Sequence, residues 1–130
     1  MEQGGGRVKF ATCLNCMDGR VQEPVISWIK DNFEVDFVDM ITEAGMDGYL
    51  ADSKSDVSRI QKKVNISLNR EGSINTVFVV GHYDCLGNPA DDKTHKKQIN
   101  ISLERVKTFS PKVEVFGLWV SSEWTVEKIV

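Results

Sequence analysis

VKFATCLNCMDGR, the stretch from Val8 to Arg20, decides how this chain is expected to fold. Its first part, Val8 to Leu14, is nearly continuous in apolar and β-favouring residues, which is typical of a strand buried on both faces of a parallel sheet. Its second part, Cys16 to Arg20, is polar and brings together a thiol, a carboxylate and a guanidinium. The stretch therefore predicts a buried strand that ends in a loop with chemically active side chains.

Similar apolar runs recur along the chain and alternate with segments of helical spacing. The other expected strands are Val35 to Ile41, Thr76 to Val80 and Val113 to Val120. The apolar positions that define the expected helices are Val25, Ile29 and Phe33; Val57, Ile60, Val64 and Leu68; and Ile99, Leu103, Val106 and Phe109. Pro24 suits the first turn of the first helix, and Gly72 is expected to cap the second. This order predicts an α/β fold with three layers, α/β/α, around a central and mainly parallel sheet of four to five strands.

The composition is that of an ordinary globular protein, and it excludes several classes of function. Of the 130 residues, 41% are hydrophobic and 27% are charged, and the formal net charge is -3. No basic cluster favours a nucleic-acid partner, and no apolar run is long enough to span a membrane. The N-terminus lacks the pattern of a signal peptide, so we expect a cytoplasmic location. Residues 1–6 are expected to be a flexible lead-in, and residues 7–130 a single domain.

A second group of reactive side chains, GHYDC from Gly81 to Cys85, follows the expected strand Thr76 to Val80. In open α/β sheets, ligands bind at the carboxyl ends of strands where the strand order reverses. We therefore expect His82 and Cys85 to lie close to the loop from Cys16 to Arg20. Zinc prefers thiolate and imidazole ligands, and a catalytic zinc usually has three protein ligands and one open position. The two motifs together predict a zinc site.

The third ligand must be either Cys13 or Cys16. The chain has three cysteines and no secretion signal, which favours reduced thiols over disulfides. Cys13 lies inside the expected strand and Cys16 at its exit, and side chains three residues apart on a strand face opposite ways. Cys16 is therefore the expected ligand, and Cys13 is expected to be a buried core thiol. The alternative is that the C-x-x-C spacing builds a closed structural zinc site together with His82 and Cys85, or a redox pair.

Asp18 and Arg20 stand beside the expected ligand Cys16. Arginine presents a planar fork that can pair with a carboxylate and fix its orientation. An exposed ion pair of this kind contributes little to stability, but the position of this one next to a candidate ligand favours a functional role. Asp18 could accept a hydrogen bond from a water molecule on the metal, or it could bind the metal itself as a fourth ligand.

These residues resemble the motifs of a known family. Cys16-Met17-Asp18-Gly19-Arg20 resembles the C-x-D-x-R motif of the β-class carbonic anhydrases, and His82-Tyr83-Asp84-Cys85 resembles their H-x-x-C motif. The chain looks like a compact, divergent member of that family.

The resemblance implies one zinc ion (Zn2+) per chain, held by Cys16, His82 and Cys85, and a catalytic pair formed by Asp18 and Arg20. It also implies the reversible hydration of carbon dioxide to bicarbonate by a zinc-bound hydroxide. A homodimer or higher homo-oligomer is implied as well, because in that family residues of the partner subunit complete the pocket.

Two other functions would use the same ligands. One is a zinc-binding module that senses or scaffolds without turnover. It is favoured by Glu43, in the run Thr42 to Gly45 where many relatives carry Arg-Asn-Ala-Gly, and by Leu86, which separates Cys85 from Gly87. The other is a hydrolase that acts on carbonyl sulfide or carbon disulfide.

Several residues outside the motifs carry expectations of their own. His95 stands among charged residues, so we expect it to be a solvent-exposed surface histidine. Trp124 lies in a terminal segment and is the best candidate for a contact with a second subunit. Trp28 and Trp119 are expected in the core or in an interface.

Overall fold

Five strands form one sheet within residues 8–130, the part of the chain that the computed structural model describes; the expected lead-in, residues 1–6, lies outside it. The strands are β1 (Phe10–Asn15), β2 (Phe37–Thr42), β3 (Ser73–His82), β4 (Glu114–Val120) and β5 (Val126–Lys128). Their order across the sheet is β2-β1-β3-β4-β5. The first four run parallel to one another, and β5 runs antiparallel to β4. The expected α/β fold with a mainly parallel sheet is confirmed.

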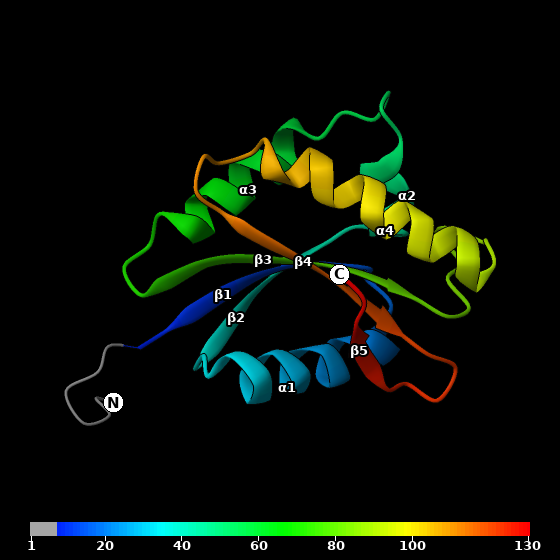
Figure 1. The fold of residues 1–130 in the computed structure, drawn as a ribbon, viewed down its shortest axis with the longest axis horizontal. Helices are drawn as coiled ribbons and strands as arrows, with labels where there is room; N and C mark the ends of the chain where they lie inside the picture. Colours follow the sequence, from blue (N-terminus) through cyan, green and yellow to red (C-terminus); the bar gives the residue numbers. More distant parts are fainter. Residues whose placement is uncertain (1–7) are drawn as a thin grey trace.

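Helices flank this sheet on its two sides. They are the 3-10 helix η1 (Gly19–Val21) and the α-helices α1 (Gln22–Phe33), α2 (Met46–Ala51), α3 (Ser58–Leu68) and α4 (Asp92–Lys107). Figure 1 shows α2, α3 and α4 on one side of the sheet and α1 on the other. The helices found within residues 8–130 are too short or too polar to span a lipid bilayer.

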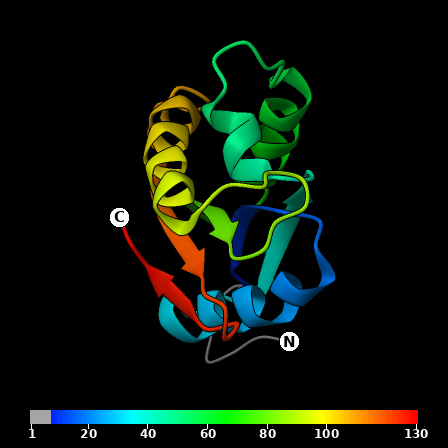
Figure 2. The same ribbon diagram turned by 90° about the vertical axis from the view of Figure 1, so that its right-hand side faces the viewer.

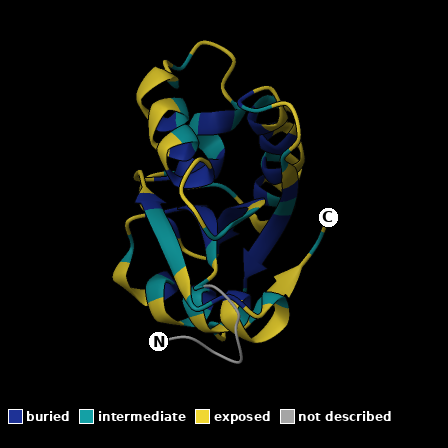
Figure 3. Cartoon of the chain, turned by 90° about the vertical axis from the view of Figure 1, so that its left-hand side faces the viewer, coloured by how far each residue is buried: buried dark blue, intermediate teal, exposed yellow. Residues whose placement is uncertain are grey.

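The central strands bury side chains toward both sides, which explains their nearly continuous apolar sequence. Leu14 and Val79 belong to the core that contains residues of α2, α3 and α4. The adjacent Cys13 and Phe78 belong to the core that contains residues of α1. Figure 3 shows the result as buried central strands and inner helix faces, with exposed outer helix faces.

The strand order reverses between β1 and β3, since β1 pairs with β2 on one side and with β3 on the other. The carboxyl ends of β1 and β3 therefore form the switch point at which α/β sheets bind ligands. Figure 2 looks onto this end of the sheet, where the loop after β3 approaches the end of β1. This is the place where the two sequence motifs were expected to meet.

The structure differs from the sequence-based expectations in three local features. Neither α2 nor β5 was expected, because each is too short to show a period of its own. The expectation that Gly72 caps the second helix is wrong: α3 ends at Leu68, and its C-cap is Asn69. Gly72 instead lies in the turn before β3 with φ +94°, where an added side chain would collide with the carbonyl oxygen of Val8.

Candidate metal centre

Cys16, His82 and Cys85 come together where β1 and β3 end. Their ligand atoms all lie within 4.8 Å of one another, and the Sγ atoms of Cys16 and Cys85 are 3.8 Å apart. All three residues are buried, His82 with 1% of its surface exposed and each cysteine with 5%. Two loops that are far apart in the sequence thus form a group that could hold a metal ion.

The imidazole of His82 is oriented to bind through Nε2. Its Nδ1 lies 2.7 Å from the carbonyl oxygen of Tyr83, so Nδ1 carries the proton and donates it to this oxygen. Nε2 is buried and has no hydrogen-bond partner among the residues that the structure describes. A buried polar atom without a partner is costly, and a lone pair left free in this way is what a metal ion binds. The residues present therefore fit a metal.

The two thiols of the group differ in how readily they ionise. Burial raises the pKa of Cys16, but the neighbouring imidazole of His82 and the backbone N–H of Gly45 outweigh it, and the pKa falls to about 7. Burial and the negative charge of Cys16 raise the pKa of Cys85 to about 11. Two thiolates so close together repel each other, so a cation between them would allow both to ionise.

The loop that carries Cys16 is fixed by amide side chains on either side of it. The Oδ1 atom of Asn15 accepts a hydrogen bond of 2.8 Å from the N–H of Cys16, and its Nδ2 donates to the carbonyl of Val21 at 3.1 Å. The Nε2 atom of Gln22 donates to the carbonyl oxygens of Cys16 and Asp18, both at 2.8 Å. Sequence analysis did not single out Asn15, which directly precedes the motif, or Gln22, which follows it by two residues.

Asp18 and Arg20 form the expected ion pair. Arg20 donates from Nη2 to Oδ2 of Asp18 at 2.7 Å and from Nε to Oδ1 at 3.1 Å, so both carboxylate oxygens are engaged. Asp18 also caps η1, because its Oδ1 accepts the backbone N–H of Arg20 at 2.9 Å. The hydrogen bonds from Arg20 lower the pKa of Asp18 to about 2, against the opposing effect of burial. The carboxylate is thus held ionised and in one orientation.

Within residues 8–130, the group that could hold a metal includes neither Cys13 nor Asp18. Cys13 is fully buried in β1 among the residues that pack with α1, and burial raises its pKa. The expectation of a buried core thiol at this position is confirmed. The closed site that would combine Cys13 with the other three residues is not what the structure shows.

Backbone from two loops closes around the thiol of Cys16. The N–H of Gly45 points at the Sγ atom of Cys16 over 3.5 Å. Gly45 has φ +62°, and a Cβ atom there would lie 2.6 Å from the carbonyl oxygen of Gly87. Only glycine allows this approach of two backbones. Glu43, two residues earlier, is exposed.

A family profile described as "Putative carbonic anhydrase" matches residues 6–130 of the chain. The chain belongs to this family. The resemblance carried by the two motifs is thereby confirmed.

A solved structure, the carbonic anhydrase from Glaciozyma antarctica, is similar to the chain with a TM-score of 0.60 and 15% sequence identity. The similarity covers 92% of this chain and 81% of that one, and at this identity it shows the fold alone. A comparison with curated protein sequences finds no match.

In this member of the carbonic anhydrase family, His95 is not the exposed surface residue that its charged neighbours suggested. Its side chain is 1% exposed, and its Nδ1 lies 2.6 Å from Oδ2 of Asp47, which is 2% exposed. The other carboxylate oxygen of Asp47 accepts hydrogen bonds from the backbone N–H of Gly48 at 2.8 Å and from Nδ2 of Asn88 at 3.1 Å. The expectation for His95 was wrong because the residue belongs to the buried face of α4, four positions before Ile99.

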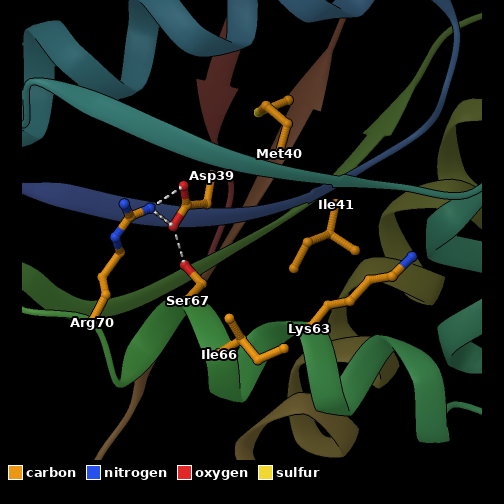
Figure 4. Close-up of a pocket in the computed structure, with 7 residues that line it drawn as sticks. All are labelled: Asp39, Met40, Ile41, Lys63, Ile66, Ser67 and Arg70. Carbon is orange, nitrogen blue, oxygen red and sulfur yellow. Dashed lines mark hydrogen bonds and ion pairs between the residues drawn. The ribbon is translucent and has the colours of Figure 1, made fainter.

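Among the surface pockets formed by residues 8–130, one lies beside β2 and another borders the candidate metal centre. The larger, about 530 Å³, lies between β2 and α3 and is shown in Figure 4. It is lined by Asp39, Met40, Ile41, Lys63, Ile66, Ser67 and Arg70. The smaller, about 270 Å³, borders the metal centre, because Gly45 is among the residues that line it. It is lined by Ala44, Gly45, Gly48, Tyr49, Gly87, Asn88 and Gln98.

Proposed function

We propose that this protein is a zinc-dependent carbonic anhydrase, a lyase that interconverts carbon dioxide and bicarbonate. Cys16, His82 and Cys85 would hold one zinc ion, and Asp18 and Arg20 would act beside it. The observation that carries the proposal is the buried and unpartnered Nε2 of His82, in a group whose ligand atoms, one from His82 and the two cysteine sulfur atoms, all lie within 4.8 Å of one another. Two sulfur donors and one nitrogen donor form the set that zinc prefers, and three protein ligands leave a position for chemistry.

Bound zinc would supply Lewis acidity, which makes water nucleophilic near neutral pH. The chain's own part in the reaction falls to Asp18 and Arg20. One Asp18 oxygen accepts a hydrogen bond from the attacking water, so that a lone pair of the water oxygen faces the carbon of the substrate. Arg20 keeps the carboxylate ionised and unable to rotate, because it engages both oxygens.

The reaction joins one water molecule to one molecule of carbon dioxide. The water oxygen forms a bond to carbon, one of the two C–O double bonds becomes single, and one proton leaves to solvent. The product is bicarbonate, and the reverse reaction takes up the same proton. No oxidant or further reactant is needed.

The ligands are tested by metal analysis and a carbon dioxide hydration assay on the same samples. We expect Cys16→Ser, His82→Ala and Cys85→Ser each to lose most of the bound zinc and all measurable hydration. Cys13→Ser is the matched control: it removes a buried thiol of the same core, and it should keep its zinc and lose only stability.

Loss of zinc from Cys13→Ser as complete as that from Cys16→Ser would contradict the ligand assignment. A parent protein with full zinc and no hydration above the buffer rate would contradict the reaction. Assays with carbonyl sulfide and carbon disulfide on that same sample would show whether the protein hydrolyses one of these compounds instead of hydrating carbon dioxide.

A homodimer is part of the proposal, since the family resemblance implies that a second subunit completes the pocket. Met17, Tyr83 and Leu86 support it: each directly follows a proposed ligand in the chain, and they are 65%, 43% and 91% exposed. Exposed apolar side chains gathered around a site favour coverage by another protein surface. Light scattering on the zinc-loaded protein tests this, and an active monomer would overturn it.

A further inference from the structure

Arg20 contacts residues of three segments that are distant from one another in the sequence. Besides its two side-chain hydrogen bonds to Asp18, the guanidinium donates from Nη2 to the backbone carbonyl of Asp84 at 3.1 Å and from Nη1 to Oδ2 of Asp84 at 3.3 Å. Its guanidinium carbon lies 4.5 Å from the centre of the Trp124 ring. The loop after β1, the loop after β3 and the turn before β5 thus converge on one side chain.

Asp84 and Trp124, which contact Arg20 from the other two segments, both have positive φ angles. In the described part of the chain, the non-glycine residues with positive φ are Glu34, Asn75, Asp84 and Trp124. Glu34 is the C-cap of α1, where this conformation is common. For a bulky residue such as Trp124, with φ +60°, the left-handed conformation is costly and persists only where the surroundings impose it.

The turn before β5 imposes the conformation of Trp124 independently of Arg20. The N–H of Trp124 donates to the carbonyl of Ser121 at 2.9 Å, and the N–H of Ser121 donates to the carbonyl of Thr125 at 3.0 Å. Directly after this turn, Val126 pairs with Val120 of β4. The ring of Trp124 also packs against the core that contains α1. The tryptophan ring is therefore a fixed surface against which Arg20 is placed.

We infer that Trp124 is a positioning residue for the proposed reaction: its ring holds Arg20, and Arg20 in turn orients Asp18. The inference rests on the proposed function. The side chain of Arg20 is 45% exposed, so without a fixed surface beside it the guanidinium would sample other rotamers. The face of an aromatic ring attracts a guanidinium and leaves its N–H groups free to donate sideways to a carboxylate. Sequence analysis expected Trp124 at a subunit contact; within the chain, its ring contacts Arg20.

The test compares Trp124→Leu, which removes the aromatic face, with Trp124→Phe, which keeps one, in the zinc-loaded full chain. We expect Trp124→Leu to lower kcat roughly two- to fivefold, on the scale of an exposed cation–π contact, with KM for carbon dioxide unchanged. Trp124→Phe should keep most of the parental kcat. The Nε–H signal of Arg20 in nitrogen-15 NMR, assigned with Arg20→Lys, should shift in the leucine variant, because the ring current on it is lost.

The matched control is Trp28→Leu, since Trp28 belongs to the same core and its ring packs on Phe33 and Phe78. It should cost stability but leave kcat and the Arg20 signal at parental values. A Trp124→Leu variant with parental kcat, or with an unmoved Arg20 signal, would overturn the inference. So would an equal fall of kcat in Trp28→Leu, because the effect would then be general loosening of the core. If the parent itself shows no hydration, the proposed function fails, and the Arg20 signal alone decides whether Trp124 holds this side chain.

Discussion

Two pairs of side chains in this protein have nearly the same contact distance and opposite surroundings. In the pair on the loop that carries Cys16, Nη2 of Arg20 lies 2.7 Å from Oδ2 of Asp18, and the side chains are 45% and 18% exposed. In the interior pair, Nδ1 of His95 lies 2.6 Å from Asp47, and the side chains are 1% and 2% exposed. Distance alone would rank them as equals, but water screens the first pair and is excluded from the second.

The two pairs therefore contribute differently to the stability of the protein. Asp47 joins α2 to α4 through His95 and to the loop after β3 through Asn88, and Ser102 of α4 donates to its backbone carbonyl at 2.9 Å. Removing the Asp47 carboxylate leaves the buried imidazole of His95 without its partner. Water can replace Arg20 as the hydrogen-bond partner of Asp18 at little cost in stability, so the main role of this pair is in the proposed reaction. A third pair, Asp39 and Arg70 in the pocket of Figure 4, is about as exposed as the first, with side chains 28% and 44% exposed, but Asp39 also accepts a hydrogen bond from the buried hydroxyl of Ser67.

The largest effect on stability is expected from Asp47→Ala. The change leaves His95 without its acceptor in the interior, and it also removes an acceptor from Asn88 and from the N–H of Gly48, which are partly exposed. We expect the free energy of unfolding to fall by about 3–5 kcal/mol, as measured by urea denaturation. A loss below about 1 kcal/mol would show that water reaches the pair, and the contrast with Asp18 would disappear.

An intermediate effect is expected from Asp39→Ala. Asp39 accepts hydrogen bonds from Arg70 at 2.8 Å and from Ser67 at 2.6 Å, and solvent screens part of this arrangement. We expect a loss of about 1–2 kcal/mol in the same denaturation experiment. The matched control is Arg70→Lys, which keeps the charge but loses the planar group over the ring of Phe10, 3.7 Å from its centre. A loss as large as that of Asp47→Ala would show that exposure does not separate the interior pair from the two solvent-exposed ones.

The smallest effect on stability, and the sharpest separation of stability from function, is expected from Asp18→Asn. The free energy of unfolding should change by less than about 1 kcal/mol, because the pair is at the surface. Zinc should be retained, and turnover should fall roughly 10–100-fold, since an amide can donate as well as accept and so misorients the attacking water. Glu104→Gln, in the exposed pair of Lys107 and Glu104, is the control for an ion pair with no role at the site. Parental turnover in Asp18→Asn would remove Asp18 from the mechanism.

The metal centre and Cys13 are the features that the sequence predicts best. The motifs around Cys16 and His82 were recognisable because each follows a buried strand, and parallel strands end at one edge of a sheet. The same reasoning placed Cys13 in the core correctly, since it depends only on the alternation of a strand.

The features that were missed depend on helix phase or on distant contacts. His95 was assigned to the surface from its charged neighbours, although its spacing from Ile99 puts it on the buried face of α4. The contact between Trp124 and Arg20 could not be predicted, because it depends on β5, a strand too short to show a pattern. Asp47 was missed for a related reason: it lies in α2, which has only six residues.

The close approach of Gly45 and Gly87 determines where this site can vary in sequence. A Cβ atom on Gly87 would lie 2.7 Å from the backbone nitrogen of Gly45, so neither position has room for any other residue. The position next to Gly45 has room, since Ala44 is exposed. A saturation-mutagenesis scan should therefore find two strictly intolerant positions, Gly45 and Gly87, and a permissive one at Ala44. New side chains can be introduced at Ala44, beside the metal centre, without disturbing the hydrogen bond to the thiol of Cys16.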